Sequence, residues 1–172
     1  MQPRISNLRL SPEAETRKRN NKQVNTALNG EMLVDTGADT CCVGRGFTIV
    51  EYTDRHVTLR GYSDRSEEQE RVPVVTAATA VTLDDNTTVI LVIHEALYLG
   101  EGQHTSLLNL NRVRFAGHKA DDIPQFLSQG TSIHGIKTTN EEYIPFTLQG
   151  KSSLLYVRVP RIGKRRTAST SR

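Results

Sequence analysis

The sequence has no tryptophan, only four phenylalanines and five tyrosines, and just two cysteines in 172 residues. With so few aromatic side chains, a hydrophobic core must be built mainly from Val, Leu, Ile and Ala. The two cysteines, Cys41 and Cys42, are adjacent, and a disulfide between neighbouring residues has strained geometry. We therefore expect both thiols to be reduced, in a reducing compartment, with no role in binding a metal.

Long apolar segments are also missing. No run approaches the roughly 20 residues that a membrane-spanning helix needs, and the N-terminus lacks the apolar stretch of a signal peptide. The five histidines have no metal-ligand spacing, and no Gly-x-Ser-x-Gly motif of a serine hydrolase occurs. We expect a cytoplasmic protein of one domain with tails and no membrane contact.

The charges are divided unevenly along the chain. Residues 1–30 carry a net charge of +4 and residues 158–172 one of +6, so residues 31–157 carry −7 within a total of +3. The basic ends could contact nucleic acid or act as import signals. The alternative is that residues 1–25 and 160–172 are solvated, disordered tails. We adopt this second interpretation, which leaves nucleic acid as a partner of the tails only.

Between the tails, short apolar runs alternate with turn residues, which predicts a mostly β protein with one short helix. The polar segment 60–71 suits the tip of an exposed hairpin, and 84–86 suits a tight turn. Residues 106–115 combine a strand end with a helix that stops at Gly117. Further strands are expected at 32–34, 41–43, 47–52, 56–59, 72–83, 87–99, 131–136, 142–148 and 154–159.

The most informative segment is 33–40, Leu-Val-Asp-Thr-Gly-Ala-Asp-Thr, in which an apolar strand ends at Asp35. A carboxylate in such a setting needs a partner, hydrogen bonds or a proton. An aspartic protease satisfies this need by pairing two carboxylates that share one proton. The sequence has a single Asp-Thr-Gly or Asp-Ser-Gly string. Such a site therefore requires a second copy of the chain, with Asp35 facing its mate across a two-fold axis.

Two segments resemble a known family. Residues 35–39 resemble the active-site loop of retropepsins, the aspartic proteases of retroviruses and retrotransposons. Residues 106–117, Ser-Leu-Leu-Asn-Leu-Asn-Arg-Val-Arg-Phe-Ala-Gly, resemble the stretch and helix that cross behind that loop. Together with 96–99, they also resemble the end of Ty1/copia-type proteases. The resemblance covers about residues 31–120 and implies an acid-protease barrel with one short helix, whose active site is completed by a dimer.

The resemblance also implies an activity. It predicts an endopeptidase that processes a retroelement polyprotein, in which the Asp dyad activates water without cofactor or metal. Its partners would be a second copy of the chain and its own polyprotein, in the cytoplasm or in virus-like particles. The expected catalytic residues are Asp35, Thr36 and Gly37, and the expected substrate-binding residues are Ala38, Asp39, Gly61 and Tyr62.

The chain also departs from the family. Asn109 stands where retroviral members usually carry Gly, and Leu110 stands where many carry an Arg that pairs with the Asp of the catalytic loop. Arg112 and Arg114 are candidates to replace that Arg. The expected flap around Gly61 has one glycine and several charges. An alternative function is therefore a catalytically inactive, domesticated or decayed module of the same fold that dimerises or binds peptide or nucleic acid.

The expected organisation has four parts. A basic tail at 1–25 precedes a retropepsin-like domain at 26–120. Residues 121–159 form a β-rich segment that follows the protease in a polyprotein, and residues 160–172 form a second basic tail.

Overall fold

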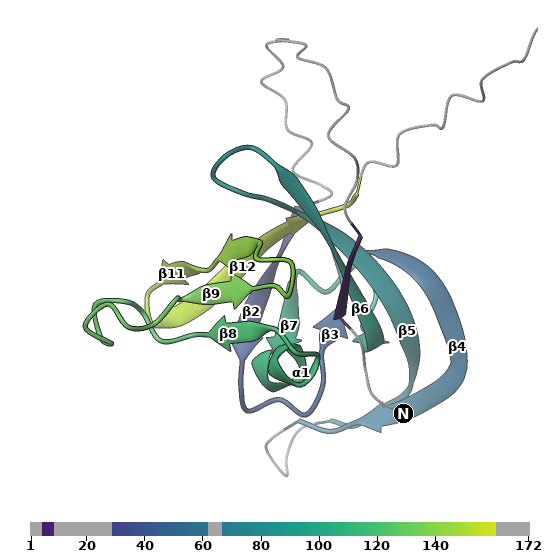
Figure 1. Ribbon diagram of the computed structural model, residues 1–172. Coiled ribbons are helices and arrows are strands. Elements are labelled where there is room, and N and C mark those ends of the chain that lie inside the picture. Colours follow the sequence, from purple (N-terminus) through teal and green to yellow (C-terminus); the bar gives the residue numbers. More distant parts are fainter. Residues whose placement is uncertain (1–4, 9–28, 62–66, 161–172) are drawn as a thin grey trace, which may run out of the picture.

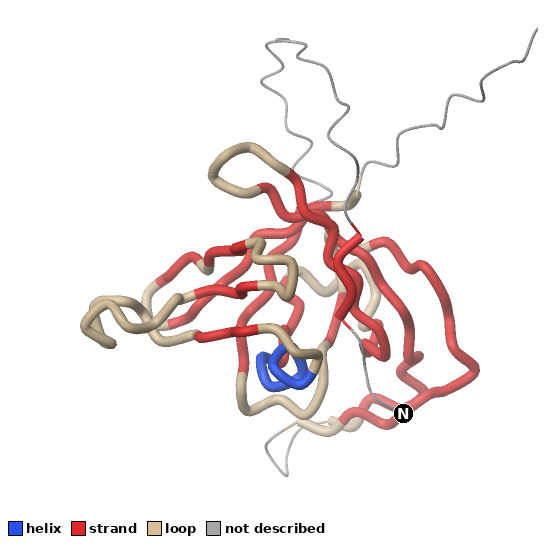
Figure 2. Tube along the Cα trace, viewed as in Figure 1, coloured by secondary structure: helices blue, strands red, loops and turns tan. Residues whose placement is uncertain are grey.

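The computed structural model describes residues 5–8, 29–61 and 67–160. These residues form a mostly β fold with one short helix, α1 (Leu110–Phe115), as the sequence predicts. Figures 1 and 2 show the strands wrapped around a common centre, with α1 beside them. The strands are β1 (Ile5–Leu8), β2 (Asn29–Asp35), β3 (Cys42–Val43), β4 (Thr48–Leu59), β5 (Gln69–Thr82), β6 (Thr88–Tyr98), β7 (Thr105–Asn109), β8 (Lys119–Asp121), β9 (Gly135–Lys137), β10 (Tyr143–Pro145), β11 (Thr147–Gln149) and β12 (Ser152–Arg158).

Six of the strands pair into a closed ring. Strand β2 is parallel to β7 and antiparallel to β12, and β3 joins β7 to β6. Strand β6 pairs with β5, and β5 reaches β12 through Ala80 and Arg158. The Thr79 hydroxyl reinforces this last junction by donating to the Arg158 carbonyl at 3.1 Å. A sheet that closes in this way pairs both edges of each member and encloses a core.

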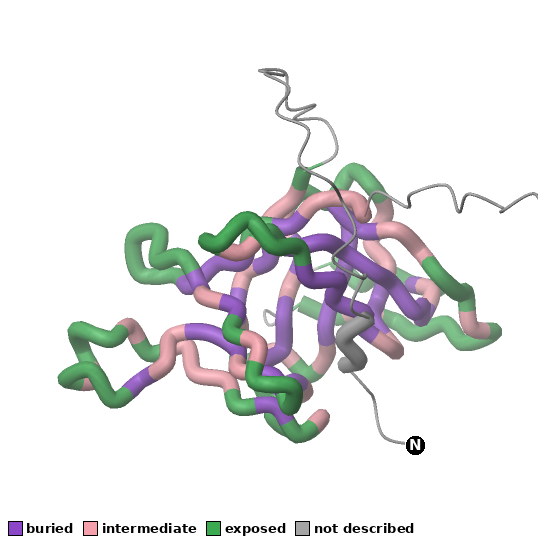
Figure 3. The backbone as a smooth tube through the Cα atoms, turned by 45° about the horizontal axis from the view of Figure 1, so that its top comes forward, coloured by how far each residue is buried: buried purple, intermediate pink, exposed green. Residues whose placement is uncertain are grey.

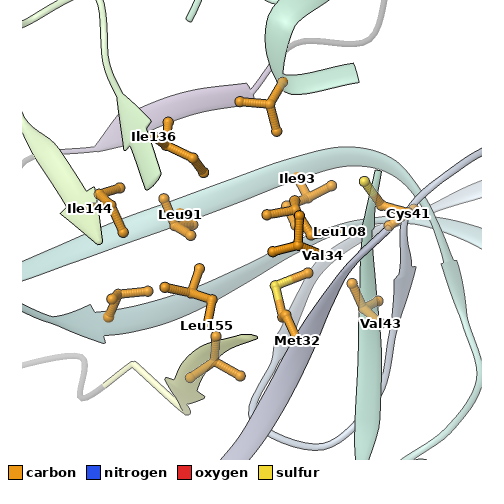
Figure 4. Close-up of a cluster of buried hydrophobic side chains, with 14 of the residues drawn as sticks. Met32, Val34, Cys41, Val43, Leu91, Ile93, Leu108, Ile136, Ile144 and Leu155 are labelled. Atoms are coloured by element: carbon orange, nitrogen blue, oxygen red, sulfur yellow. The ribbon is translucent and has the colours of Figure 1, made fainter. Parts of the chain in front are cut away.

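Alternating side chains of β2 and β7 separate two faces. Met32, Val34 and Leu108 point into the central cluster and are 9% exposed or less (Figure 4). Leu33 and Leu107, which are register partners, lie on the opposite face and are only half-buried. Because successive residues of a strand point to opposite faces, the apolar run before Asp35 serves both faces at once.

A small second sheet of β8, β9 and β10 covers one side of the ring. Its Ile136 and Ile144 pack in the same cluster as Leu91 and Leu155 (Figure 4). Burying a side chain of this size stabilises the fold by about 1.5–3 kcal/mol. The second sheet is therefore part of the core.

Strands from both sides of the expected domain boundary at residue 120 belong to one sheet. Strand β12 pairs with β2 along its length, from Leu154–Leu33 to Arg158–Asn29, so the expected post-protease segment completes the ring. Of the strand expected at 131–136, only residues 135 and 136 lie in a strand, β9. The one expected at 142–148 divides into β10 and β11, which belong to different sheets. The break falls at Phe146, whose N–H donates to the His134 carbonyl. Phe146 directly follows Pro145, the last residue of β10, which has no N–H for a ladder.

The hairpin of β4 and β5 is confirmed, with a difference in its first strand. The segments 47–52 and 56–59, expected as two strands, form the single strand β4, which keeps its pairing through register shifts. Most of β4 is exposed, whereas β5 is buried from Val74 to Val81. Figure 3 shows buried segments at the centre of the molecule and exposed segments around them.

Strand β1 was not expected. It lies within residues 1–25, for which the sequence predicted no regular structure, and it pairs antiparallel with residues 90–93 of β6. Because β6 pairs with β3 only at its end, the preceding residues offer free ladder positions to an added strand. The other residues expected in the basic tails, apart from Pro160, lie outside the described residues.

Candidate active site

The loop that contains Asp35 begins where two parallel strands end together. Asp35 is the last residue of β2, and its register partner Asn109 is the last residue of β7. Helix α1 follows Asn109 directly, so the helix and residues 36–41 leave the same edge of the sheet. Figure 1 shows the loop between β2 and β3 beside α1. The parallel pairing thus brings the two resembling segments of the sequence into contact.

The Asp35 carboxylate is partly exposed and hydrogen-bonded within its own loop. The Gly37 N–H donates to Asp35 Oδ1 at 2.7 Å. A Cβ atom added at Gly37 would lie 3.3 Å from the same oxygen, which is a tight contact. Because glycine has no Cβ, the Gly37 backbone can approach the Asp35 carboxylate closely enough for its N–H to donate a hydrogen bond without crowding the oxygen. Thr36 and Gly37 are exposed, so this part of the loop is open to a partner.

Asn109 connects the loop to the start of the helix. Its Oδ1 accepts from the Arg112 N–H at 3.1 Å, which makes it the N-cap of α1. Its Nδ2 donates to the Ala38 carbonyl. The side chain is 4% exposed, and both ends of its amide have partners. The Asn109 side chain thus connects the loop to the start of the helix on both sides.

Two more residues of α1 hold neighbouring positions of the loop. Asn111 Nδ2 donates to the Thr36 carbonyl at 3.2 Å, and the Arg112 guanidinium donates to the Thr40 hydroxyl. Together with the contact from Asn109, α1 and its cap bind residues 36, 38 and 40 in turn. Sequence reasoning did not single out Asn111 or Thr40. The spacing of polar residues at 109, 111 and 112 after an apolar strand is the signal that points to them.

The two candidate arginines bind carboxylates outside the loop. Arg112 pairs with Glu95 of β6 at 3.5 Å, and Arg114 pairs with Asp122 at 3.8 Å. Arg114 also donates to Asn111 Oδ1 at 2.8 Å. Asp39 is exposed and, within the described part of the chain, has no ion pair. The prediction that one of these arginines replaces the family's partner of the loop Asp is therefore wrong for Asp39.

The remaining predicted substrate-binding residues lie in two places. Ala38 is half-buried in the loop, with its carbonyl bound by Asn109. Gly61 is exposed at the end of the β4–β5 hairpin, near an ion pair of 2.8 Å between Arg60 and Glu68. Tyr62 lies outside the described residues.

A smaller apolar cluster connects the β4–β5 hairpin to β3 and β6. Its buried members belong to β3, β5 and β6, and three partly exposed leucines complete it. Leu107 lies two residues before Asn109 and pairs with Leu33, so it is close to the start of the loop. Leu59 belongs to β4 and Leu99 follows β6. We name these residues the leucine wall: Leu59, Leu99 and Leu107.

Both cysteines are buried beside the loop. Cys41 and Cys42 are free thiols with 1% and 4% exposure. Burial raises the pKa of Cys41, and burial together with the neighbouring Cys41 raises the pKa of Cys42 to about 11. Since the thiolate is the reactive form, neither residue suits nucleophilic catalysis at neutral pH.

Among the described residues, no group of three or more His, Cys, Asp or Glu side chains could hold a metal ion. In the same part of the chain, no helix has the length and apolarity to cross a membrane. Comparisons with protein-family models, with curated proteins and with solved structures found no match.

Proposed function

We propose that the protein is an aspartic endopeptidase of the retropepsin type, active as a homodimer with one Asp35 from each chain. The observation that carries this proposal is the loop itself. A carboxylate ends a strand, accepts a hydrogen bond from the Gly37 N–H, and lies beside exposed backbone at Thr36 and Gly37. The contacts from α1 hold this arrangement in place. The closed ring of six strands supports the proposal of a retropepsin-like barrel.

The chemistry follows from bringing two such carboxylates together. At a separation of a few ångströms they cannot both be ionised, so one keeps a proton and the other polarises a water molecule. The water attacks the amide carbonyl while the protonated carboxyl donates to the carbonyl oxygen. The two titrations then belong to the pair. We expect the highest activity at about pH 5–6.

The surroundings of the loop support a peptide substrate. Leu59 of the β4–β5 hairpin and Leu107 of β7 pack against the same buried cluster, so the leucine wall extends from the hairpin toward the start of the loop. An extended peptide that lies along the leucine wall would find apolar contacts close to Asp35. We propose cleavage next to apolar side chains, within the polyprotein from which the protein itself derives. The exposed Asp39 is available to accept an amide hydrogen from the same peptide.

The test is a cleavage assay on peptides that span the chain's own flanking sequence, combined with the molecular mass in solution. We expect a dimer, cleavage on the acid side of neutrality, and loss of cleavage in Asp35→Asn. The matched control is Asp84→Asn, which changes an exposed carboxylate in the β5–β6 turn. A dimer that binds the peptide without cleaving it would instead support the inactive module of the same fold.

A further inference from the structure

Glu95 lies at an irregular point of β6. Its backbone is left-handed, with φ of +55°, which is uncommon for a residue other than glycine. Between the pairs on either side, β5 advances by two residues, from 75 to 77, while β6 advances by three, from 96 to 93. The extra residue is a β-bulge, a feature that redirects side chains and is frequent near active sites. The bulge turns Glu95 out of the regular alternation of β6.

The Glu95 carboxylate is bound by two arginines from different elements. Arg55 of β4 contacts Oε1 at 2.9 Å, and Arg112 of α1 contacts Oε2 at 3.5 Å. The side chains of Glu95 and Arg112 are 24% and 18% exposed, whereas that of Arg55 is 57% exposed. The inner pair is thus partly shielded from water, where the attraction between charges is stronger than at the surface.

The main chain of Glu95 also contacts the loop. Its carbonyl accepts from the Arg112 guanidinium at 3.2 Å and from the Thr40 hydroxyl at 3.5 Å. Arg112 in turn donates to Thr40. One residue therefore contacts, directly or through one guanidinium, both the β4–β5 hairpin and the loop that carries Asp35.

We infer that Glu95 is a positioning residue that couples the β4–β5 hairpin to the catalytic loop. The inference rests on the proposed function, because it assigns the hairpin and the loop to the two sides of a bound peptide. Arg55 fixes β4 to the Glu95 carboxylate, and Arg112 fixes the same carboxylate to Thr40. The separation of hairpin and loop, and so the fit of the peptide between them, is set at Glu95.

The kinetic test uses Glu95→Gln, which keeps the side-chain length and the main-chain carbonyl but removes the charge. We expect kcat/KM to fall about tenfold, chiefly through KM, because the peptide is captured between two elements that are no longer held together. Arg55→Gln should give a similar loss, and the double variant should show no further loss, because Arg55 acts through Glu95. The matched control is Arg60→Gln, which breaks another ion pair of the same hairpin.

A second readout does not depend on cleavage. Amide hydrogen exchange should become faster in Glu95→Gln both at residues 36–41 and around Arg55, and stay unchanged in Glu141→Gln, which breaks the remote pair with Lys137. Exchange that changes on one side only, or losses in kcat/KM that add in the double variant, would overturn the inference. If Glu95→Gln does not fold, the exposed Arg55→Gln gives the same exchange test. A wild-type protein without cleavage would refute the proposed function, while the exchange result still decides the coupling.

Discussion

Helix α1 has two faces of opposite character, and their comparison explains how the fold serves the loop. On one face, Leu110 and Val113 are fully buried in the core cluster. On the other, Asn111, Arg112 and Arg114 contact the loop, β6 and Asp122 through polar groups. The apolar face fixes where the helix lies. The polar face holds the residues around Asp35 relative to the helix. Mutations on the apolar face should therefore mainly lower stability, and mutations on the polar face should mainly lower activity.

The largest effect is expected on kcat/KM, at Asp35, whose loop is held by the polar face of α1. Asp35→Asn should lower kcat/KM at least about 1000-fold, because the pair can no longer share a proton and activate water. The unfolding free energy should stay nearly unchanged, since the carboxylate is partly exposed and Asn keeps its acceptor for the Gly37 N–H. Peptide cleavage and urea unfolding of the same preparation measure both quantities. Cleavage within tenfold of wild type would contradict the assignment.

The apolar face should respond in stability first. Leu110 is fully buried, so Leu110→Ala should lower the unfolding free energy by about 2–5 kcal/mol through lost burial and a cavity. Urea denaturation measures this loss. The control is Phe115→Ala on the same helix, where the side chain is 71% exposed and its removal should change little. Equal losses at the two positions would mean that the helix does not dock by this face.

The cap between the faces should separate stability from activity. Asn109→Ala removes the N-cap and should lower the unfolding free energy by about 0.5–2 kcal/mol. It also removes the contact with the Ala38 carbonyl and should reduce kcat. In Asn109→Ser the hydroxyl can cap the helix but is too short to replace the amide at Ala38, so stability should recover more than kcat. Equal recovery of both would show that the contact with Ala38 is unimportant.

The last prediction concerns the buried thiols behind the loop, and its effect is confined to alkaline pH. The pKa of Cys42 is raised from 9.0 to about 11 in the folded protein. Above about pH 9 the thiol ionises in the unfolded chain before it does so in the folded one, so stability present at lower pH is lost as the pH rises toward 11. Urea denaturation should show this loss in wild type and a smaller one in Cys42→Ser. Identical pH profiles of the two proteins would contradict the raised pKa.

The loop and its supporting strand were predictable, because they depend on local sequence. An apolar run that ends at Asp35, and a second that ends at Asn109 and begins a helix, each specify a strand and its end. The resemblance implies only that residues 106–117 cross behind the loop, and the parallel pairing of β2 with β7 comes from the structure. The turn at 84–86 and the exposed hairpin were predictable for the same reason, from turn residues between β-branched runs.

Contacts between distant segments were not predictable from those signals. The pairing of β12 with β2 depends on how the ring closes, and the sequence of residues 152–158 does not indicate which strand they pair with. The proposed role of Glu95 depends on a one-residue bulge in β6. The sequence of β6 contains no glycine that would indicate a bulge. The change of sheet at Phe146 depends on a hydrogen bond to the His134 carbonyl. The only local signal for it is Pro145, which lacks an N–H for a strand ladder. Strand β1 likewise depends on the edge that β6 offers.

The most direct test of the account mixes the wild-type chain with Asp35→Asn at constant total concentration, under conditions where subunits exchange. If each active site needs one Asp35 from each of two chains, only dimers of two wild-type chains cleave. The rate should then follow the square of the wild-type fraction, so that an equal mixture retains about a quarter of the full activity. A rate that falls in direct proportion to the wild-type fraction, leaving half, would show that a single Asp35 suffices and would contradict the shared site.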